Sequence, residues 1–78
     1  MKNSGISYRV RNKYEMQLNL KGIKPNTILR SDVSGLYMII TEINLEGLFL
    51  QFRSLSEKRD TIYSMPLSTF LAGKWEIQ

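Results

Sequence analysis

Residues 35–53 read GLYMIITEINLEGLFLQFR, and the predicted fold is built around this segment. It holds two apolar, β-favouring runs, Leu36–Ile43 and Leu48–Phe52, joined by the four residues from Asn44 to Gly47. Asparagine commonly begins a type I turn, and glycine readily adopts the positive φ that such connections require. The pattern therefore predicts a β-hairpin at the centre of the chain.

The sequence leaves two registers open for this hairpin. A bulge after the turn, at Gly47, would place Ile40 opposite Phe52, whereas a four-residue loop would place Ile39 there. We favour the bulged register, because it gathers polar and amphipathic side chains on the outer face. These side chains are Tyr37, Thr41, Gln51 and Arg53. Its weakness is Glu42, which would then lie at the inner rim of the sheet.

The segments on either side of the hairpin complete the predicted sheet. Toward the N-terminus, apolar residues alternate with polar ones from Ile6 to Leu20, which predicts an extra strand or hairpin there. A short helix over Tyr14–Lys21 is the alternative, because most of these residues have good helix propensity. Toward the C-terminus, Pro66–Ala72 predicts one short helical turn between two strands, since proline suits the first turn of a helix.

From Ile23 to Ile77 the chain resembles a Src-homology-3-like small β-barrel. The resemblance is carried by IKPNTILR at residues 23–30, by the central hairpin, and by MPLSTFLAGKWEI at residues 65–77. It implies an all-β barrel, here with an extra N-terminal strand or hairpin, and it suggests a bacterial or phage accessory protein. It does not imply recognition of proline-rich ligands, because the exposed aromatic run and the acidic loop of peptide-binding members are missing. An oligonucleotide-binding barrel is the alternative fold.

The composition limits the size and the chemistry of the protein. With 78 residues there is room for one domain, and the sequence contains no cysteine and no histidine. Disulfides, thiolate or imidazole metal ligands and histidine acid–base catalysis are therefore excluded. The carboxylates are scattered, and the serines lack the partners of a nucleophilic site. We expect a non-enzymatic protein without catalytic, cofactor-binding or metal-binding residues.

The same composition bears on domain boundaries and location. We expect residues 1–5 to form a flexible N-terminus and residues 6–78 to form a single barrel domain. No apolar run approaches the roughly 20 residues of a membrane span, so no membrane partner is expected. The N-terminus shows no signal-peptide pattern, and a domain without disulfides must be held by packing, which favours the cytoplasm.

Positive charge is concentrated in the first 24 residues, where six basic residues accompany one acid. On the predicted strand, Arg9, Arg11 and Lys13 share one face, with Lys21 and Lys24 further along the chain. Such a surface is typical of binding to nucleic acid or to an acidic partner. Charges on an exposed strand also keep a sheet edge from pairing with another chain, and this second interpretation stays open.

Three hypotheses of function follow. The first is a small intracellular binding module that acts through a protein partner, by sheet-edge pairing or through Tyr37 and Tyr63, which we expect side by side on the outer face. The second is a nucleic-acid-binding barrel that uses the basic N-terminal segment. The third is a homo-oligomeric structural subunit whose exposed sheet edges pair with each other.

Overall fold

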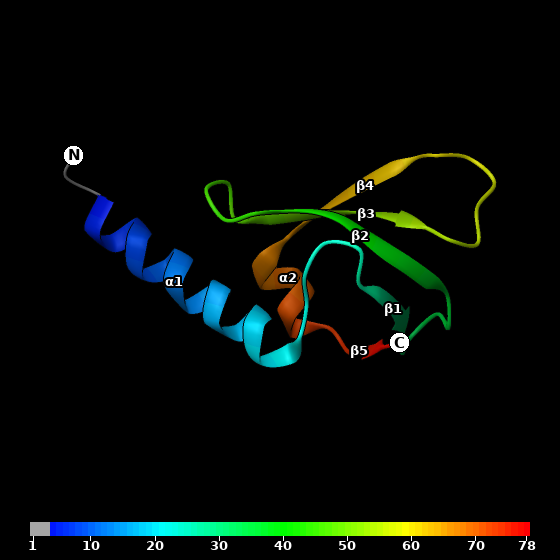
Figure 1. Cartoon of the computed structure of the whole chain (residues 1–78), viewed down its shortest axis with the longest axis horizontal. Helices are drawn as coiled ribbons and strands as arrows, with labels where there is room; N and C mark the ends of the chain where they lie inside the picture. Colours follow the sequence, from blue (N-terminus) through cyan, green and yellow to red (C-terminus); the bar gives the residue numbers. More distant parts are fainter. Residues whose placement is uncertain (1–3) are drawn as a thin grey trace.

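The computed structural model describes residues 4–78, with side chains from Arg9 onward. Its five strands are β1 (Ile28–Ser31), β2 (Tyr37–Asn44), β3 (Phe49–Ser54), β4 (Ile62–Pro66) and β5 (Trp75–Ile77). Helix α1 (Ser4–Lys21) precedes them, and α2 (Leu67–Ala72) connects β4 to β5 (Figure 1). The strands form one antiparallel sheet in the order β4-β3-β2-β1-β5. The protein is therefore mostly β with an N-terminal helix.

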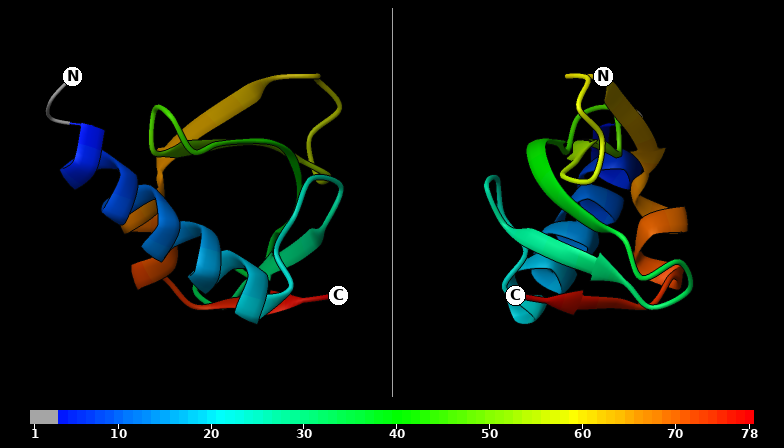
Figure 2. Two further views of the ribbon diagram at one scale, coloured as in Figure 1. Left: turned by 60° about the vertical axis from the view of Figure 1, so that its left-hand side comes forward. Right: turned by 90° about the vertical axis from the view of Figure 1, so that its right-hand side faces the viewer.

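The sheet curves strongly but stays open. β4 and β5 are its two outer strands, and over residues 4–78 they do not pair with each other. Figure 2 shows the sheet bending from β4 round to β5, with both helices toward its open side. The predicted closure into a barrel, of either kind considered, is therefore not observed. The two strands of the central hairpin and the helical turn between β4 and β5 lie where the sequence predicted them, to within one or two residues.

The core lies on the inner face of this curve. β1, β2 and β3 contribute Leu29, Ile40 and Leu50, each fully buried, and α2 contributes Leu67 and Phe70. Burying a side chain of this size is worth about 1.5–3 kcal/mol, so these residues supply much of the stability available to a chain of this length. α2 thus acts as the inner cover of the three central strands.

The predicted N-terminal strand or hairpin is wrong, because this segment is helical throughout α1. Tyr14 and Leu18, four residues apart, lie on one side of the helix and pack against the core. Met16 and Leu20, which completed the apparent alternation, are 63% and 81% exposed. The helical alternative over Tyr14–Lys21 was correct in type but too short. Of the expected flexible N-terminus, residues 1–3 lie outside the described residues, and the next two already belong to α1.

Helix α1 ends in a Schellman motif that explains its position on the core. Gly22 has a φ of 73°, and its N–H donates to the carbonyl of Asn19 over 3.1 Å. The N–H of Ile23 donates to the carbonyl of Leu18 over 2.9 Å. Leu18 and Ile23 are both buried in the core, which is the apolar contact that accompanies this motif.

The central hairpin is confirmed, and Ile40 lies opposite Phe52 as predicted. The bulge, however, is in β2 and not after the turn. The register shifts between Ile40 and Glu42, so Thr41 is the extra residue. Because the bulge reverses the alternation, Thr41 and Glu42 are both exposed, and Ile43 returns to the inner face. The expected problem of a glutamate at the inner rim does not arise.

The turn itself also differs from the prediction. The positive φ belongs to Leu48, at 58°, and not to Gly47. Gly47 is needed for space instead, because a Cβ at this position would lie 2.6 Å from the ring of Phe49. The side-chain oxygen of Asn44 accepts a hydrogen bond of 2.7 Å from the N–H of Gly47, as asparagine at a turn commonly does.

The helix end provides a first prediction. We expect Gly22→Ala to lower the free energy of unfolding by about 1 kcal/mol, because alanine disfavours the left-handed conformation. Gly22→Asn should cost less, since asparagine tolerates that conformation and the space around a Cβ at this position is open to 4 Å. Thermal and urea unfolding of the three proteins measures both effects. Equal stability of the wild type and the alanine variant would contradict the assignment of the motif.

Candidate functional site

The structure places the basic residues predicted to share a strand face on helix α1. Arg9 and Lys13 are exposed and four residues apart, so they lie on the same side of the helix. Arg11 points elsewhere, and its Nη1 lies 3.2 Å from the Glu46 carboxylate in the turn between β2 and β3. The predicted single row of three charges is therefore wrong, and on a helix these residues cannot protect a sheet edge.

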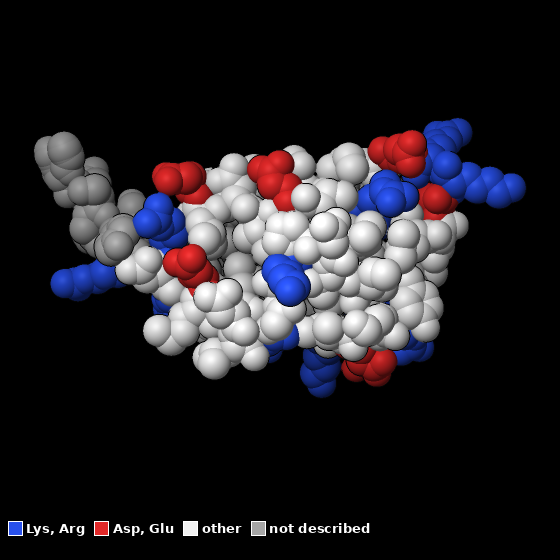
Figure 3. Space-filling model, in the orientation of Figure 1, with Lys and Arg blue, Asp and Glu red and all other residues white. Residues whose placement is uncertain are grey.

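The remaining basic candidates lie at the other end of α1. Lys21 is the last residue of the helix, and Lys24 follows in the exposed loop before β1. Tyr14, an aromatic residue between these two groups of basic residues, packs against the core. Figure 3 shows a mostly uncharged face, with acidic and basic side chains chiefly near its margin and a basic side chain near its middle. Four of the five candidates are thus spread along α1 and the fifth, Lys24, follows it in the loop, and their binding to an anionic partner stays a prediction.

The two tyrosines expected side by side lie on opposite faces of the sheet. Tyr63 of β4 is opposite Phe52, which is opposite the buried Ile40, so Tyr63 belongs to the inner face. Tyr37 precedes the buried Met38 in β2 and faces outward. The expected outer-face patch of both tyrosines is wrong. β3 lies between their strands, and the strand register puts Tyr63 on the inner face and Tyr37 on the outer face.

Tyr63 has two contacts that hold it at the end of the inner face. Its ring stacks on Phe52 with centroids 5.6 Å apart. Its hydroxyl donates a hydrogen bond of 2.6 Å to the carboxylate of Glu57 in the preceding loop. This hydrogen bond is the main reason why the pKa of Tyr63 is raised above its ordinary value. Despite these contacts, Tyr63 is 39% exposed, because the sheet ends at β4.

The structure leaves the outer edge of β5 open, and no pattern in the sequence indicated this site. Gln78 donates its N–H to the carbonyl of Ile28, and the carbonyl of Lys74 accepts from the N–H of Asp32. In an antiparallel pair, every second residue of a strand bonds to the neighbouring strand. Glu76 lies two residues from both Lys74 and Gln78, so its N–H and C=O groups also bond to β1. The backbone N–H and C=O groups of the two residues between, Trp75 and Ile77, therefore point away from the sheet. Within residues 4–78, no other strand lies along this edge.

A pocket of about 170 Å³ adjoins the β5 edge on the inner face. Most of its lining residues are apolar, and they come from the end of α1 and the chain after it, from α2 and the glycine after it, and from β5. The lining residues are Lys21, Ile23, Phe70, Leu71, Gly73, Trp75 and Ile77. The pocket can accept an apolar side chain presented by a chain that lies along β5.

Trp75 forms the rigid wall of this pocket. Its indole ring stacks on Phe70, with centroids 5.2 Å apart and an angle of 17° between the planes. Its indole N–H donates a hydrogen bond of 2.7 Å to the backbone carbonyl of Phe70. A pair of stacked rings is worth about 0.5–1.5 kcal/mol beyond its burial, so the wall is fixed before any ligand arrives.

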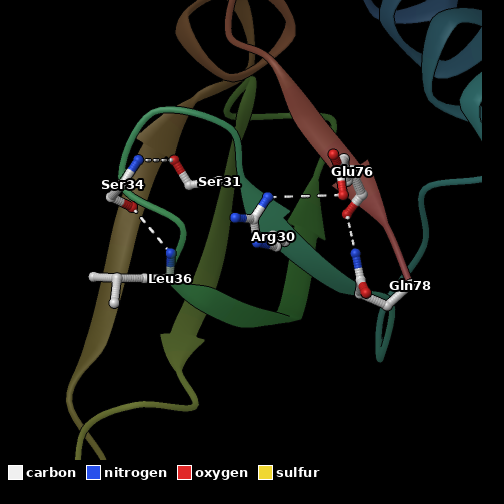
Figure 4. Close-up of polar contacts among 6 residues, drawn as sticks. All are labelled: Arg30, Ser31, Ser34, Leu36, Glu76 and Gln78. Atoms are coloured by element: carbon white, nitrogen blue, oxygen red, sulfur yellow. Dashed lines mark hydrogen bonds and ion pairs between the residues drawn. The ribbon is translucent and has the colours of Figure 1, made fainter.

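The opposite face of β5 is polar (Figure 4). Arg30 of β1 lies outward beside Glu76, with 3.8 Å between its Nη1 and the carboxylate. The side chain of Gln78 donates to the backbone carbonyl of Glu76 over 3.2 Å. β5 therefore has an apolar inner side, a polar outer side and a row of free backbone groups between them, which is what strand addition requires.

Comparisons with known proteins return no match: no protein-family model, no curated protein and no solved structure is significantly similar to this chain. The class is therefore defined by architecture alone, as a small five-stranded antiparallel open sheet with an N-terminal helix. No helix within the described residues has the length and apolar character needed to cross a bilayer.

The wall of the pocket provides a second prediction. A Cβ at Gly73 would lie 2.9 Å from the indole nitrogen of Trp75, so Gly73→Ala must displace the ring. We expect a loss of about 1–3 kcal/mol in unfolding free energy, as for other overpacked sites, and a shifted indole N–H signal in the NMR spectrum. The neighbouring exposed Lys74→Ala is the control and should change stability by less than about 0.5 kcal/mol. An unchanged indole signal in the Gly73 variant would rule out this packing.

Proposed function

We propose that the protein is a small non-enzymatic binding module that captures an extended segment of a protein partner along β5. The observation that carries this proposal is the free edge of β5 directly beside the apolar pocket. Main-chain hydrogen bonds to Trp75 and Ile77 would supply affinity. A side chain in the pocket would supply selectivity, because alternate residues of an added strand face the same side.

We further propose that the domain is an open variant of the Src-homology-3-like small barrels. The strand order, with β1 between β2 and β5, supports this assignment, and so does the short helix between the last two strands. The cytoplasm is the proposed location, because a domain with no cysteine needs no oxidising compartment to fold.

The nucleic-acid hypothesis has weaker support from the geometry. Only Arg9 and Lys13 share one exposed side of α1, while Arg11 is engaged with Glu46. A single-strand binding surface combines a basic groove with exposed aromatic rings, and Tyr14 packs inward. We therefore place the partner site at the sheet edge.

The experiment selects short peptides from a random phage-displayed library on the immobilised protein. Enriched peptides are synthesised and titrated against the protein, with the fluorescence of Trp75, the single tryptophan of the chain, as the signal. We expect extended peptides with an apolar residue at alternate positions. Binding should slow hydrogen exchange at the amides of Trp75 and Ile77, which face the free edge.

Two proline variants give matched controls. Ile77→Pro removes a free-edge N–H of β5 and a side chain that lines the pocket, without removing a bond to β1. We expect peptide affinity to fall at least about tenfold, of which the lost hydrogen bond alone accounts for up to that factor. Ser64→Pro makes the same change at the free edge of β4 and should leave affinity unchanged. Failure to enrich any peptide, or equal loss in both variants, would refute a binding site at β5.

A further inference from the structure

The second open edge, β4, has the same kind of free backbone groups. The N–H of Leu67 donates to the carbonyl of Leu48, which fixes the alternation of bonds between β3 and β4. Tyr63 and Met65 therefore bond toward β3, whereas Ile62 and Ser64 direct their N–H and C=O groups away from the sheet. Pro66 occupies the next outward position, where the missing N–H of proline costs no bond.

Apart from Pro66 at its C-terminal end, strand β4 lacks the usual protection against pairing. Exposed edge strands in natural proteins commonly carry lysine or other charges, or are covered by other elements. β4 reads IYSMP and contains no charged residue, and Ile62 and Tyr63 are 48% and 39% exposed. The arginines and the lysine that the sequence suggested as edge protection are on α1 instead. An uncharged, half-apolar edge of this kind is a site for another strand.

We propose that β4 pairs with β4 of a second copy of this chain, antiparallel across a twofold axis, to form a dimer with one continuous sheet. Antiparallel pairing of two identical edges keeps the inner faces of both copies on the same side of the sheet. One register uses every free group without involving Pro66: Ile62 of each copy lies opposite Ser64 of the other. About four hydrogen bonds then form, two at each such pair, and the two copies of Tyr63 meet at the axis on the inner face.

Electrostatics distinguishes β4 from β5 as the self-pairing edge. Twofold symmetry brings identical residues together, and the equivalent register at β5 pairs Trp75 with Ile77 of the other copy. That register places Glu76 directly opposite Glu76, and like charges directly opposite each other destabilise a sheet. β4 itself contains no charged residue. The Glu57 carboxylate that accepts from the Tyr63 hydroxyl belongs to the preceding segment, and the charged residues of that segment, 57–60, sum to zero. The dimer therefore leaves both β5 edges open, and this inference stands independently of the function proposed for β5.

Sedimentation equilibrium of the full chain, from micromolar to millimolar concentration, tests the proposal. We expect the average mass of the wild type to rise from 9.1 kDa toward twice that value. Ser64→Pro should weaken the dimer at least about tenfold, because it removes one donor from each copy. Ile77→Pro, the same change at β5, should dimerise as the wild type does. A wild type that stays monomeric, or loss of the dimer in the β5 variant alone, would overturn the proposal.

A cross-linking measurement does not depend on the tolerance of the strand for proline. Because the chain has no cysteine, Tyr63→Cys introduces a single thiol at the proposed axis. Residues opposite each other at a position without hydrogen bonds have Cα atoms about 4.5 Å apart, which a disulfide can span. Under mild oxidation we expect Tyr63→Cys to form covalent dimer at least about tenfold faster than Ile77→Cys at the other edge. Equal rates would show random collision and would overturn the twofold contact.

Discussion

The extra residue in β2, Thr41, is the constraint on which the rest of the structure depends. In a strand with regular alternation, two residues three positions apart lie on opposite faces, so either Ile40 or Ile43 would face away from the core. The bulge lets both face inward and leaves Thr41 and Glu42 in solvent. Bulges also bend a strand and increase its twist, which fits the strong curvature of this sheet. One short sheet can therefore enclose a core that the short helix α2 covers.

The two helices complete that core in different ways. α2 contributes Leu67 and Phe70, both fully buried, and its Phe70 holds the indole of Trp75 at the start of β5. α1 contributes Leu18 near its C-terminal end, and the Schellman motif after it carries the chain back over the core. Toward its N-terminal end, the contact between Arg11 and the β2–β3 turn is an ion pair exposed to solvent, which is worth little. Among the side chains that the structure describes, from Arg9 onward, those of α1 that pack on the core, Tyr14 and Leu18, thus lie in its C-terminal half.

Local patterns predicted the central hairpin, where two apolar runs flank a turn that begins with asparagine. They did not predict α1. The apolar residues from Tyr14 to Leu20 alternate with polar ones, which favours a strand, but Tyr14 and Leu18 are also four residues apart, which suits one side of a helix. Gly22 followed by an apolar residue was the better indication, since helices commonly end this way. The site was harder to predict, because the faces of Tyr37 and Tyr63 depend on registers across two loops and a bulge. The free edge of β5 becomes visible only once β5 is known to pair with the distant β1.

The sheet ends at β4 and β5 with unpaired backbone groups, and both proposed contacts depend on this. Amide hydrogen exchange at low protein concentration, followed residue by residue by NMR, measures whether these groups are unpaired. If both edges are free, exchange alternates along the strands. It should be slow at the amides that bond inward, Tyr63, Met65 and Glu76, and fast at those that face outward, Ile62, Ser64, Trp75 and Ile77. Uniformly slow exchange along both strands in the monomer would mean that the edges are paired, and would contradict the claim.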